Sequence, residues 1–311
     1  MRLTVRTAVP GFTTARPPPP RPEGMDMPID AARAVAAEPR TAELAWDHKD
    51  VLLYHLGVGA GRPATDAEEL RYTLESRLQV LPSFSTVAGG AMALAGGLAA
   101  PGIEVDLATV LHGGQRIELH RPIPVTGRAT AIGRVEAVHD KGKAAVIVLR
   151  SDVHDDEGPL WSASTRIFVR GEGGFGGERG PSDRLEAPER EPDRTVERAT
   201  REDQALLYRL CGDWNPLHAD PEFAELAGFD RPILHGLCSY GIVLKAVVDA
   251  ALGGDATRVR AYSTRFAGIL FPGETMRIRM WNEGEGRIQV LATSVERDHA
   301  PVLADTLIEH T

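Results

Sequence analysis

Residues 236–252 read GLCSYGIVLKAVVDAAL, and this segment decides which folds the chain can adopt. It contains no proline, and its apolar side chains would lie around the whole circumference of a helix instead of along one stripe. A helix with that pattern is stable only when it is buried on nearly all sides. We therefore expect a central helix enclosed by a β-sheet.

The strands that could enclose this helix lie on both sides of it in the sequence. From 275 to 280 polar and apolar residues alternate, which predicts a strand with one apolar face. Three more segments, 143–153, 161–169 and 287–293, are bounded by Gly, Asp or Pro and predict strands in the same way. We expect these strands to pair in antiparallel fashion.

The chain also contains two related halves. Residues 52–56 (LLYHL) reappear as 206–210 (LLYRL), and 123–127 (IPVTG) resembles 269–273 (ILFPG). The segment between the halves, 171–194, is rich in Gly, Pro and charge and lacks an apolar period, which is typical of an exposed linker. The matches predict a duplicated unit, although two short matches could also arise by chance.

The N-terminal segment, residues 1–28, is predicted to be a disordered leader. It carries scattered arginines and a four-proline run, and it lacks the continuous apolar block of a secretory signal. Met25 or Met27 could instead be the initiator, and the sequence does not decide between them.

Composition excludes several classes of protein. The formal charge is -9, with 35 Lys and Arg against 44 Asp and Glu, so we expect neither nucleic acid nor an anionic membrane as a partner. Cys211 and Cys238 form no CxxC pair, which argues against structural zinc and suits a reducing compartment. The most apolar stretch, 88–100, is interrupted by glycines and is about half the roughly 20 residues that a membrane span needs.

Residues 211–236, CGDWNPLHADPEFAELAGFDRPILHG, concentrate the groups that could carry chemistry. Read alone, the Gly, Asp, Asn and Pro residues favour a surface turn whose side chains bond nearby amides. Asp213, Asn215 and His218 also form a carboxylate, an amide and an imidazole just before a helix start at Gly236. Adding water to a polarised double bond needs such groups, together with a donor for the developing enolate.

The same region resembles the type 2, (R)-specific enoyl-CoA hydratases, which are MaoC-like hot-dog proteins and include the hydratase unit of peroxisomal multifunctional enzyme type 2. The resemblance lies in residues 206–241 and in LHGGQ (111–115), DKGK (140–143), RGEGGFGG (170–177) and STRFAGILFPGE (263–274). It implies an α+β double hot dog, two antiparallel sheets each wrapped round a helix. The implied division is an acyl- and CoA-binding half at 29–170 and a catalytic half at 195–311.

The resemblance also implies roles for individual residues. Asp213 and His218 would activate one water, which Asn215 orients, and the water would add to a trans-2-enoyl-CoA to give a (3R)-3-hydroxyacyl-CoA. The amide of Gly236 would hold the thioester oxygen. The substrate-binding residues implied by the matching motifs are His112, Gly113, Lys141, Trp214, Pro216, Leu217 and Phe266. Read alone, Lys141 is an ordinary loop charge and His112 a packing histidine.

The two halves are not equivalent. Where the second half reads LLYRLCGDWNPLH, the first reads LLYHLGVGAGRPA and lacks the Asp, Asn and His, so we expect one catalytic half. The helix expected at 86–100 contains four glycines, each costing about 1 kcal/mol relative to Ala. A loosened helix there would leave room for a bulky acyl chain.

The resemblance also implies that the enzyme uses no cofactor or metal, that its substrate carries coenzyme A, and that it serves fatty-acid β-oxidation. Gly114 stands where relatives commonly have Glu, which puts some substrate contacts in doubt. The C-terminal Glu309-His310-Thr311 is not a peroxisomal address, so we expect a cytoplasmic enzyme that could form a homodimer.

Other functions remain open at this stage. Gly171, Gly173 and Gly176 form a GxGxxG pattern, but no helix is expected after it, as a dinucleotide site would require. Cys238 beside His235 could be a nucleophile, although no orienting partner is evident. A hot-dog thioesterase and a non-catalytic acyl-CoA binding protein would share the same fold.

Overall fold

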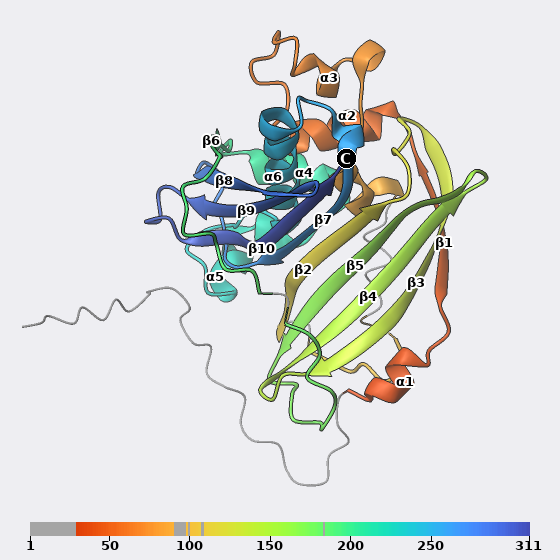
Figure 1. The fold of residues 1–311 in the computed structure, drawn as a ribbon. Coiled ribbons are helices and arrows are strands. Elements are labelled where there is room, and N and C mark those ends of the chain that lie inside the picture. Colours follow the sequence, from red (N-terminus) through yellow and green to blue (C-terminus); the bar gives the residue numbers. More distant parts are fainter. Residues whose placement is uncertain (1–28, 90–97, 99, 107–108, 183) are drawn as a thin grey trace, which may run out of the picture.

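A computed structural model describes residues 29–89, 98, 100–106, 109–182 and 184–311, so the predicted leader at 1–28 lies outside it. Ten strands form one antiparallel sheet in the order β1-β3-β4-β5-β2-β7-β10-β9-β8-β6 (Figure 1). The strands are β1 (Arg40–Trp46), β2 (Val110–Leu119), β3 (Gly127–Asp140), β4 (Ala144–Asp155), β5 (Gly158–Arg170), β6 (Arg194–Ala199), β7 (Val259–Phe266), β8 (Thr275–Gly284), β9 (Arg287–Ser294) and β10 (Pro301–His310).

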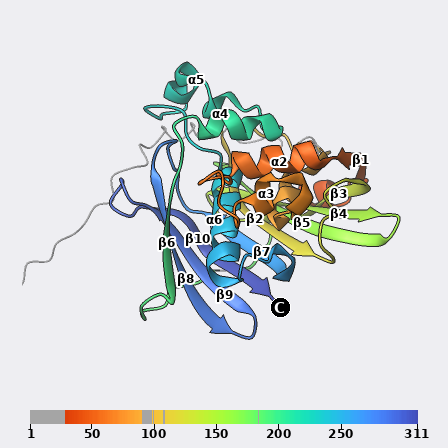
Figure 2. The same ribbon diagram turned by 90° about the horizontal axis from the view of Figure 1, so that it is seen from above.

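Helices lie before and between the strands of each half. The α-helices are α1 (Ala31–Val35), α2 (His48–Gly57), α3 (Leu70–Thr73), α4 (Gln204–Tyr208), α5 (Pro221–Leu226) and α6 (Gly236–Ala251). The 3₁₀ helices are η1 (Glu75–Arg77), η2 (Pro82–Thr86), η5 (Arg209–Cys211), η6 (Pro216–His218) and η7 (Ala256–Arg258). Seen from above, α2 and α4 lie close together beside the upper part of α6 (Figure 2).

The sheet consists of two copies of one five-strand pattern. From one edge it reads β1-β3-β4-β5-β2, and from the other it reads β6-β8-β9-β10-β7, with β2 and β7 antiparallel at the seam. The repeated sequences fall at equivalent points: 52–56 lies in α2 and 206–210 in α4 and η5, while 123–127 leads into β3 and 269–273 precedes β8. The predicted duplication and the double hot-dog fold are therefore confirmed.

The buried helix predicted from the sequence is α6. Every residue from 237 to 248 is buried, and the helix contacts β6, β7, β8 and β10. Tyr240 of α6 and Tyr262 of β7 stack with ring centroids 3.9 Å apart, and each hydroxyl donates a hydrogen bond to the other residue's backbone carbonyl. The structure thus buries the apolar residues around the whole circumference of α6, as the sequence pattern requires.

The helix expected at 86–100 is only partly described. The α-helix does not begin at Thr86, because Pro82–Thr86 form the 3₁₀ helix η2, and residues 90–97 and 99 lie outside the described residues. All five residues of η2 are buried, and the helix contacts α6, β2 and β5. The described start of this segment is therefore packed at the junction of the two halves.

The linker between the halves is exposed but anchored. Its described residues contain no helix or strand until β6 begins at Arg194. The Leu185 amide donates to Asp305, Gln289 donates to the Glu186 carbonyl, and the Trp281 indole donates to the Arg190 carbonyl. These bonds hold the linker along the second half of the sheet.

Candidate active site

The loop that carries the predicted catalytic residues is shaped by its own turn-forming groups. Gly212 ends η5 with φ of 115°, a conformation that favours glycine. The Asp213 carboxylate accepts a hydrogen bond from the Asn215 amide at 3.3 Å, and the Asn215 side-chain oxygen caps η6 by accepting from the Leu217 amide at 3.0 Å. These local bonds are the turn interactions that the sequence also predicted, and they fix the path of the chain past Asp213.

His218 is held as a neutral imidazole with one bare nitrogen. Its Nδ1 lies 2.9 Å from the Ile233 carbonyl oxygen, which can only accept, so Nδ1 carries the hydrogen and Nε2 carries a lone pair. Burial lowers the pKa of His218, while the Ile233 carbonyl and the Asp213 carboxylate oppose that shift. The ring is therefore ready to accept a proton at Nε2.

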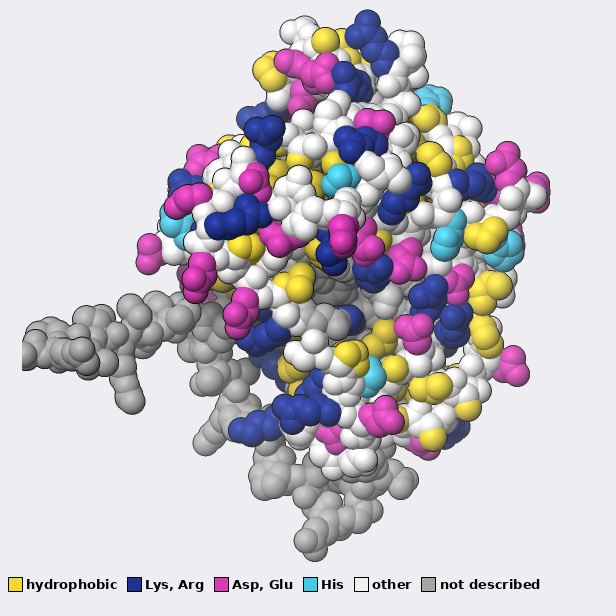
Figure 3. Space-filling model, in the orientation of Figure 1, with side chains coloured by type: hydrophobic (Ala, Val, Ile, Leu, Met, Phe, Trp, Pro, Cys, Tyr) yellow, Lys and Arg dark blue, Asp and Glu magenta, His cyan; other side chains and the backbone are white. Residues whose placement is uncertain are grey.

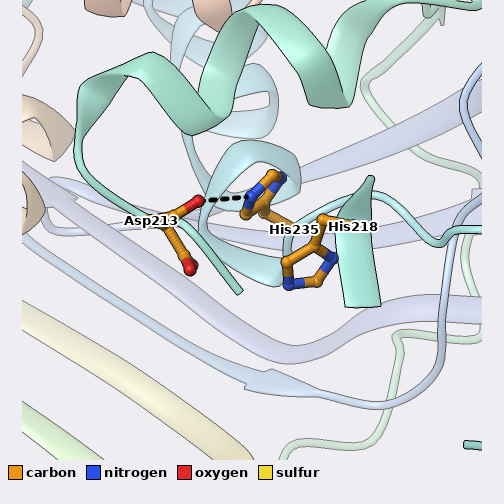
Figure 4. A group of neighbouring side chains, drawn as sticks. All are labelled: Asp213, His218 and His235. Carbon is orange, nitrogen blue, oxygen red and sulfur yellow. Dashed lines mark hydrogen bonds between the residues drawn. The ribbon is translucent and has the colours of Figure 1, made fainter. Parts of the chain in front are cut away.

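His235 completes a cluster that the sequence did not predict as part of the site. Asp213, His218 and His235 each offer one potential ligand atom, a carboxylate oxygen or a ring nitrogen, and these atoms lie within 4.8 Å of one another. Figure 4 shows the three side chains together. The His235 ring lies 3.8 Å from the His218 ring at an interplanar angle of 31°, and its Nε2 lies 3.3 Å from the Asp213 backbone oxygen. Only the presence of a histidine just before Gly236 could have signalled it.

The spacing of the cluster is compatible with one bound water. Two acceptors that share one water at about 2.8 Å each lie roughly 4.5 Å apart, which is within the spacing of this cluster. Imidazoles that ligate one ion point their in-plane lone pairs at it. The His218 and His235 rings lie 3.8 Å apart with a tilt of 31°, and His218 Nδ1 and His235 Nε2 already face backbone carbonyl oxygens, which leaves one nitrogen of each ring for another partner.

Gly236 and Phe266 form the next part of the site. Gly236 is the first residue of α6, where backbone amides have no partner within the helix and the helix dipole favours negative charge. A Cβ atom at Gly236 would lie 3.0 Å from Phe266, so the absence of a side chain lets the ring pack against the helix start. The His112 ring meets Phe266 edge-on at 4.5 Å, which brings the first half to the same place.

A cavity of about 850 Å³ connects these residues with the inner face of the first half. From the second half it is lined by Asp213, Asn215, Leu217, His218, Gly236 and Phe266. From the first half its lining includes His112, Gly113, Leu149, Trp161, Ala163 and Ile167. The cavity is large enough for a long acyl group, and residues of both halves line it.

Two polar groups from the first half face this cavity without a described hydrogen-bond partner. They are the Nε2 of His112 and the hydroxyl of Ser85. Burial lowers the pKa of His112 to about 4, so it is a neutral imidazole at ordinary pH. Ser85 lies in η2 and carried no signal in the sequence that would have marked it.

Three of the predicted substrate-binding residues do not line the cavity. Lys141 donates to the backbone carbonyls of Arg179 and Pro181 at an exposed turn. Trp214 is 57% exposed, and the Arg209 guanidinium lies 4.8 Å from its ring centre. Pro216 opens η6. The remaining four, His112, Gly113, Leu217 and Phe266, do line it.

The rival sites have structural explanations. The GxGxxG segment wraps an internal carboxylate: Asp140 accepts from the amides of Gly142, Gly174 and Gly176 at 2.7–2.8 Å, and no helix follows. Cys238 is fully buried, its thiol lies 3.3 Å from the Gly57 carbonyl, and burial raises its pKa well above the usual value. Neither is placed to bind a dinucleotide or to attack a substrate.

Charges of both signs are mixed on the part of the surface that the structure describes and Figure 3 shows. Among the described residues, no helix is both long and apolar enough to cross a membrane.

Comparison with known proteins agrees with this arrangement. Residues 44–171 match the family described as MFE-2 hydratase 2 N-terminal domain, and residues 183–300 match the MaoC like domain. The chain is 47% identical over 280 residues to enoyl-CoA hydratase ChsH3 of Mycobacterium tuberculosis, which covers 89% of this chain and 98% of that protein. It is 40% identical to the peroxisomal enoyl-CoA hydratase 2 of Arabidopsis thaliana, over 83% of this chain and 88% of that one.

Solved structures give the same result. A MaoC-like dehydratase from Phytophthora capsici superposes with a TM-score of 0.82 at 30% identity, over 91% of this chain and 98% of that chain. The full-length peroxisomal multifunctional enzyme type 2 of Drosophila melanogaster superposes with a TM-score of 0.74 at 33% identity, over 88% of this chain and 48% of that one.

Proposed function

This chain belongs to the MaoC-like dehydratases that carry an MFE-2 hydratase 2 N-terminal domain, and from that premise we propose that Asp213 and His218 activate the water it adds to its substrate. It is a hydro-lyase, an enoyl-CoA hydratase of the hydratase 2 type. The observation that carries the proposal is the cluster itself: Asp213 and His218 each bring a ligand atom to within 4.8 Å of the other, and the Ile233 carbonyl leaves the lone pair of His218 on Nε2.

The chemistry follows from that pair. A water that donates one hydrogen to Asp213 and the other to His218 leaves an oxygen lone pair free to attack C3 of the enoyl group. As the C3–O bond forms, the double-bond electrons move to the thioester oxygen, which the Gly236 amide stabilises. The proton taken from water is then delivered to C2. Both acceptors touch the same water, so either can carry that proton.

Addition of the hydroxyl and the proton from one side of the double bond gives a single product enantiomer. We expect (3R)-3-hydroxyacyl-CoA, as the family resemblance implies. Chiral separation of the product of crotonyl-CoA hydration tests this expectation, and an excess of the 3S product would contradict it.

Asp213→Asn tests the proposed mechanism. Removing the carboxylate should lower kcat for crotonyl-CoA by on the order of 10² or more, because an acid/base group is lost. The assay follows loss of the enoyl absorbance, and release of CoA thiol is measured in parallel to detect thioesterase activity. Asp220→Asn is the matched control, because Asp220 caps α5 by accepting from the Glu222 amide and asparagine caps helices equally well. A folded Asp213→Asn enzyme with the wild-type rate would refute the mechanism. If neither the wild-type protein nor the variant hydrated crotonyl-CoA, the site would have a non-catalytic acyl-CoA binding role.

The homodimer and the cytoplasmic location expected from the sequence stay predictions. Sedimentation velocity at micromolar concentration tests the first of them, and a single species at the monomer mass of 33.6 kDa would contradict it.

A further inference from the structure

His235 is an unusual residue for its position. It is 1% exposed at the N-cap of α6, where small polar side chains commonly bond the first helical amides, yet its side chain makes no such bond. An imidazole buried there needs another reason, because burying a polar ring without using its hydrogen-bonding groups is costly.

The hydrogen bonds of His235 fix its tautomer. Its Nε2 lies 3.3 Å from the backbone oxygen of Asp213, which can only accept, so Nε2 carries the hydrogen. Its Nδ1 is buried and has no hydrogen-bond partner among the described residues. The one N–H of the ring is therefore donated to the backbone of Asp213, the residue whose carboxylate is proposed to hold the water.

The faces of the His235 ring are also occupied. One contact is the His218 ring, at a centroid distance of 3.8 Å and a tilt of 31°, and another is the Tyr208 ring at 4.9 Å. Gly236, whose amide would hold the thioester oxygen, is the next residue in the chain. One side chain thus touches the backbone of Asp213 and the ring of His218, and it directly precedes the proposed oxyanion donor.

We propose that His235 is a positioning residue for hydration: its N–H holds the Asp213 backbone, and its ring face supports the imidazolium that forms when His218 takes a proton. This inference rests on the proposed function, because it presumes that His218 becomes charged during the reaction. An aromatic face beside a cation is attractive, and the attraction is larger where water is excluded.

The support requires His235 to remain neutral. Burial, and then the neighbouring His218, lower the pKa of His235 to about 3. The groups that face His218 are the Asp213 carboxylate and His235, and those that face His235 from its other sides are Arg209 and Tyr208. Arg209 also opposes a charge on His235, whereas the Asp213 carboxylate favours a charge on His218, so any proton gained by the pair goes to His218.

Three substitutions separate the two contacts. His235→Phe keeps an aromatic face and loses the N–H, whereas His235→Gln keeps an N–H near the position of Nε2 and loses the face. His235→Leu loses both. We expect kcat for crotonyl-CoA to fall about ten-fold in the Phe and Gln variants and about a hundred-fold in the Leu variant, with KM changed less than about three-fold.

The pH dependence of kcat distinguishes a positioning role from a merely structural one, because a structural role would leave the acid limb of the profile in place. Without the ring face, the His218 imidazolium is less stable, so the acid limb of the kcat profile should shift to lower pH in the Gln and Leu variants. It should stay near the wild-type position in the Phe variant. Thermal unfolding of each variant shows whether it is folded, and the comparison of Phe with Gln decides the matter if the Leu variant does not fold.

Wild-type kcat in the Phe and Gln variants would overturn the inference, and so would equal losses with an unmoved acid limb in all folded variants. These results are distinguishable from failure of the proposed function. If only the His235 series is unaffected while Asp213→Asn is inactive, the hydration mechanism stands and His235 has no positioning role. If Asp213→Asn is fully active as well, both proposals fail.

Discussion

His55 shows how a single buried imidazole ties the stability of this protein to pH. It is fully buried in α2, its Nδ1 donates to the Tyr72 carbonyl at 2.9 Å, and its Nε2 accepts from the Leu81 amide at 3.2 Å. Both ring nitrogens are thus used, and only the neutral form can make both bonds. Burial lowers the pKa of His55 from 6.5 to about 4.

Acid should therefore destabilise the protein through His55. The folded pKa lies below the unfolded one, so between pH 6.5 and 4 the unfolded chain binds more protons. The contribution to the free energy of unfolding is complete above pH 6.5 and falls by about 3 kcal/mol as pH drops to 4. His112 and His235, with pKa values of about 4 and about 3, act in the same direction.

His55→Gln provides the measurement, because glutamine can both donate and accept and does not titrate. Urea unfolding of both proteins between pH 4 and 7 should show a smaller slope in the variant, by up to about 1.4 kcal/mol per pH unit. If the free energy of unfolding has the same slope against pH in both proteins, the pKa of His55 is the same in the folded and the unfolded state.

At the scale of the element, α6 carries two glycines with different duties. Gly241 lies where α6 meets α2, and a Cβ atom there would lie 2.5 Å from Val58 and 2.6 Å from the Tyr54 hydroxyl. The atoms nearest to a Cβ atom at Gly236 would belong to the Phe266 ring, at 3.0 Å. The first glycine permits close helix packing, and the second leaves space beside the proposed oxyanion donor.

Alanine at each position should separate these duties. Gly241→Ala should lower the free energy of unfolding by about 1–3 kcal/mol, because the overpacking outweighs the roughly 1 kcal/mol that alanine gains in a helix. Gly236→Ala should leave stability nearly unchanged and lower kcat/KM on the order of ten-fold, since Phe266 must shift. Urea unfolding and the hydration assay on both variants check this, each variant serving as the control for the other. A more stable Gly241→Ala protein would show that α2 and α6 are not in close contact.

For the whole molecule, the two halves share one topology, and the sequence predicts that they differ in function. The second half supplies Asp213, His218 and the α6 N-terminus, and apolar side chains of both halves line the cavity beside them. Strands β2 and β7 pair with each other and so join the two halves into one continuous sheet.

Ala163→Phe tests that division, because Ala163 faces the cavity from β5 far from the catalytic groups in sequence. Filling this space should lower kcat/KM for long-chain enoyl-CoA by about ten-fold or more and change crotonyl-CoA hydration less than about three-fold. Glu136→Phe adds the same ring at an exposed position of β3 and should have little effect on either substrate. An equal loss of kcat/KM for long-chain and four-carbon substrates would contradict an acyl-binding chamber in the first half. A wild-type enzyme that accepts only four-carbon substrates would contradict it as well.

The sequence by itself determined the elements and their repetition. The all-round apolar pattern of 236–252 required an enclosed helix, and alternation at 275–280 gave a strand whose apolar residues are buried in the structure. These signals are local, because the period of side chains along a helix or strand is written into consecutive residues. The grouping of Asp213, Asn215 and His218 could also be predicted from the sequence, because one short segment carries all three residues.

Only the tertiary structure decided which groups meet. Nothing in the local pattern says that the His235 N–H bonds the backbone of Asp213, that its ring covers His218, or that Lys141 bonds the carbonyls of the linker instead of lining the cavity. Those contacts join residues more than fifteen positions apart. They exist because burying α6 inside the sheet fixes where its N-terminus lies, and the free energy of that burial is a property of the whole core and not of any one segment.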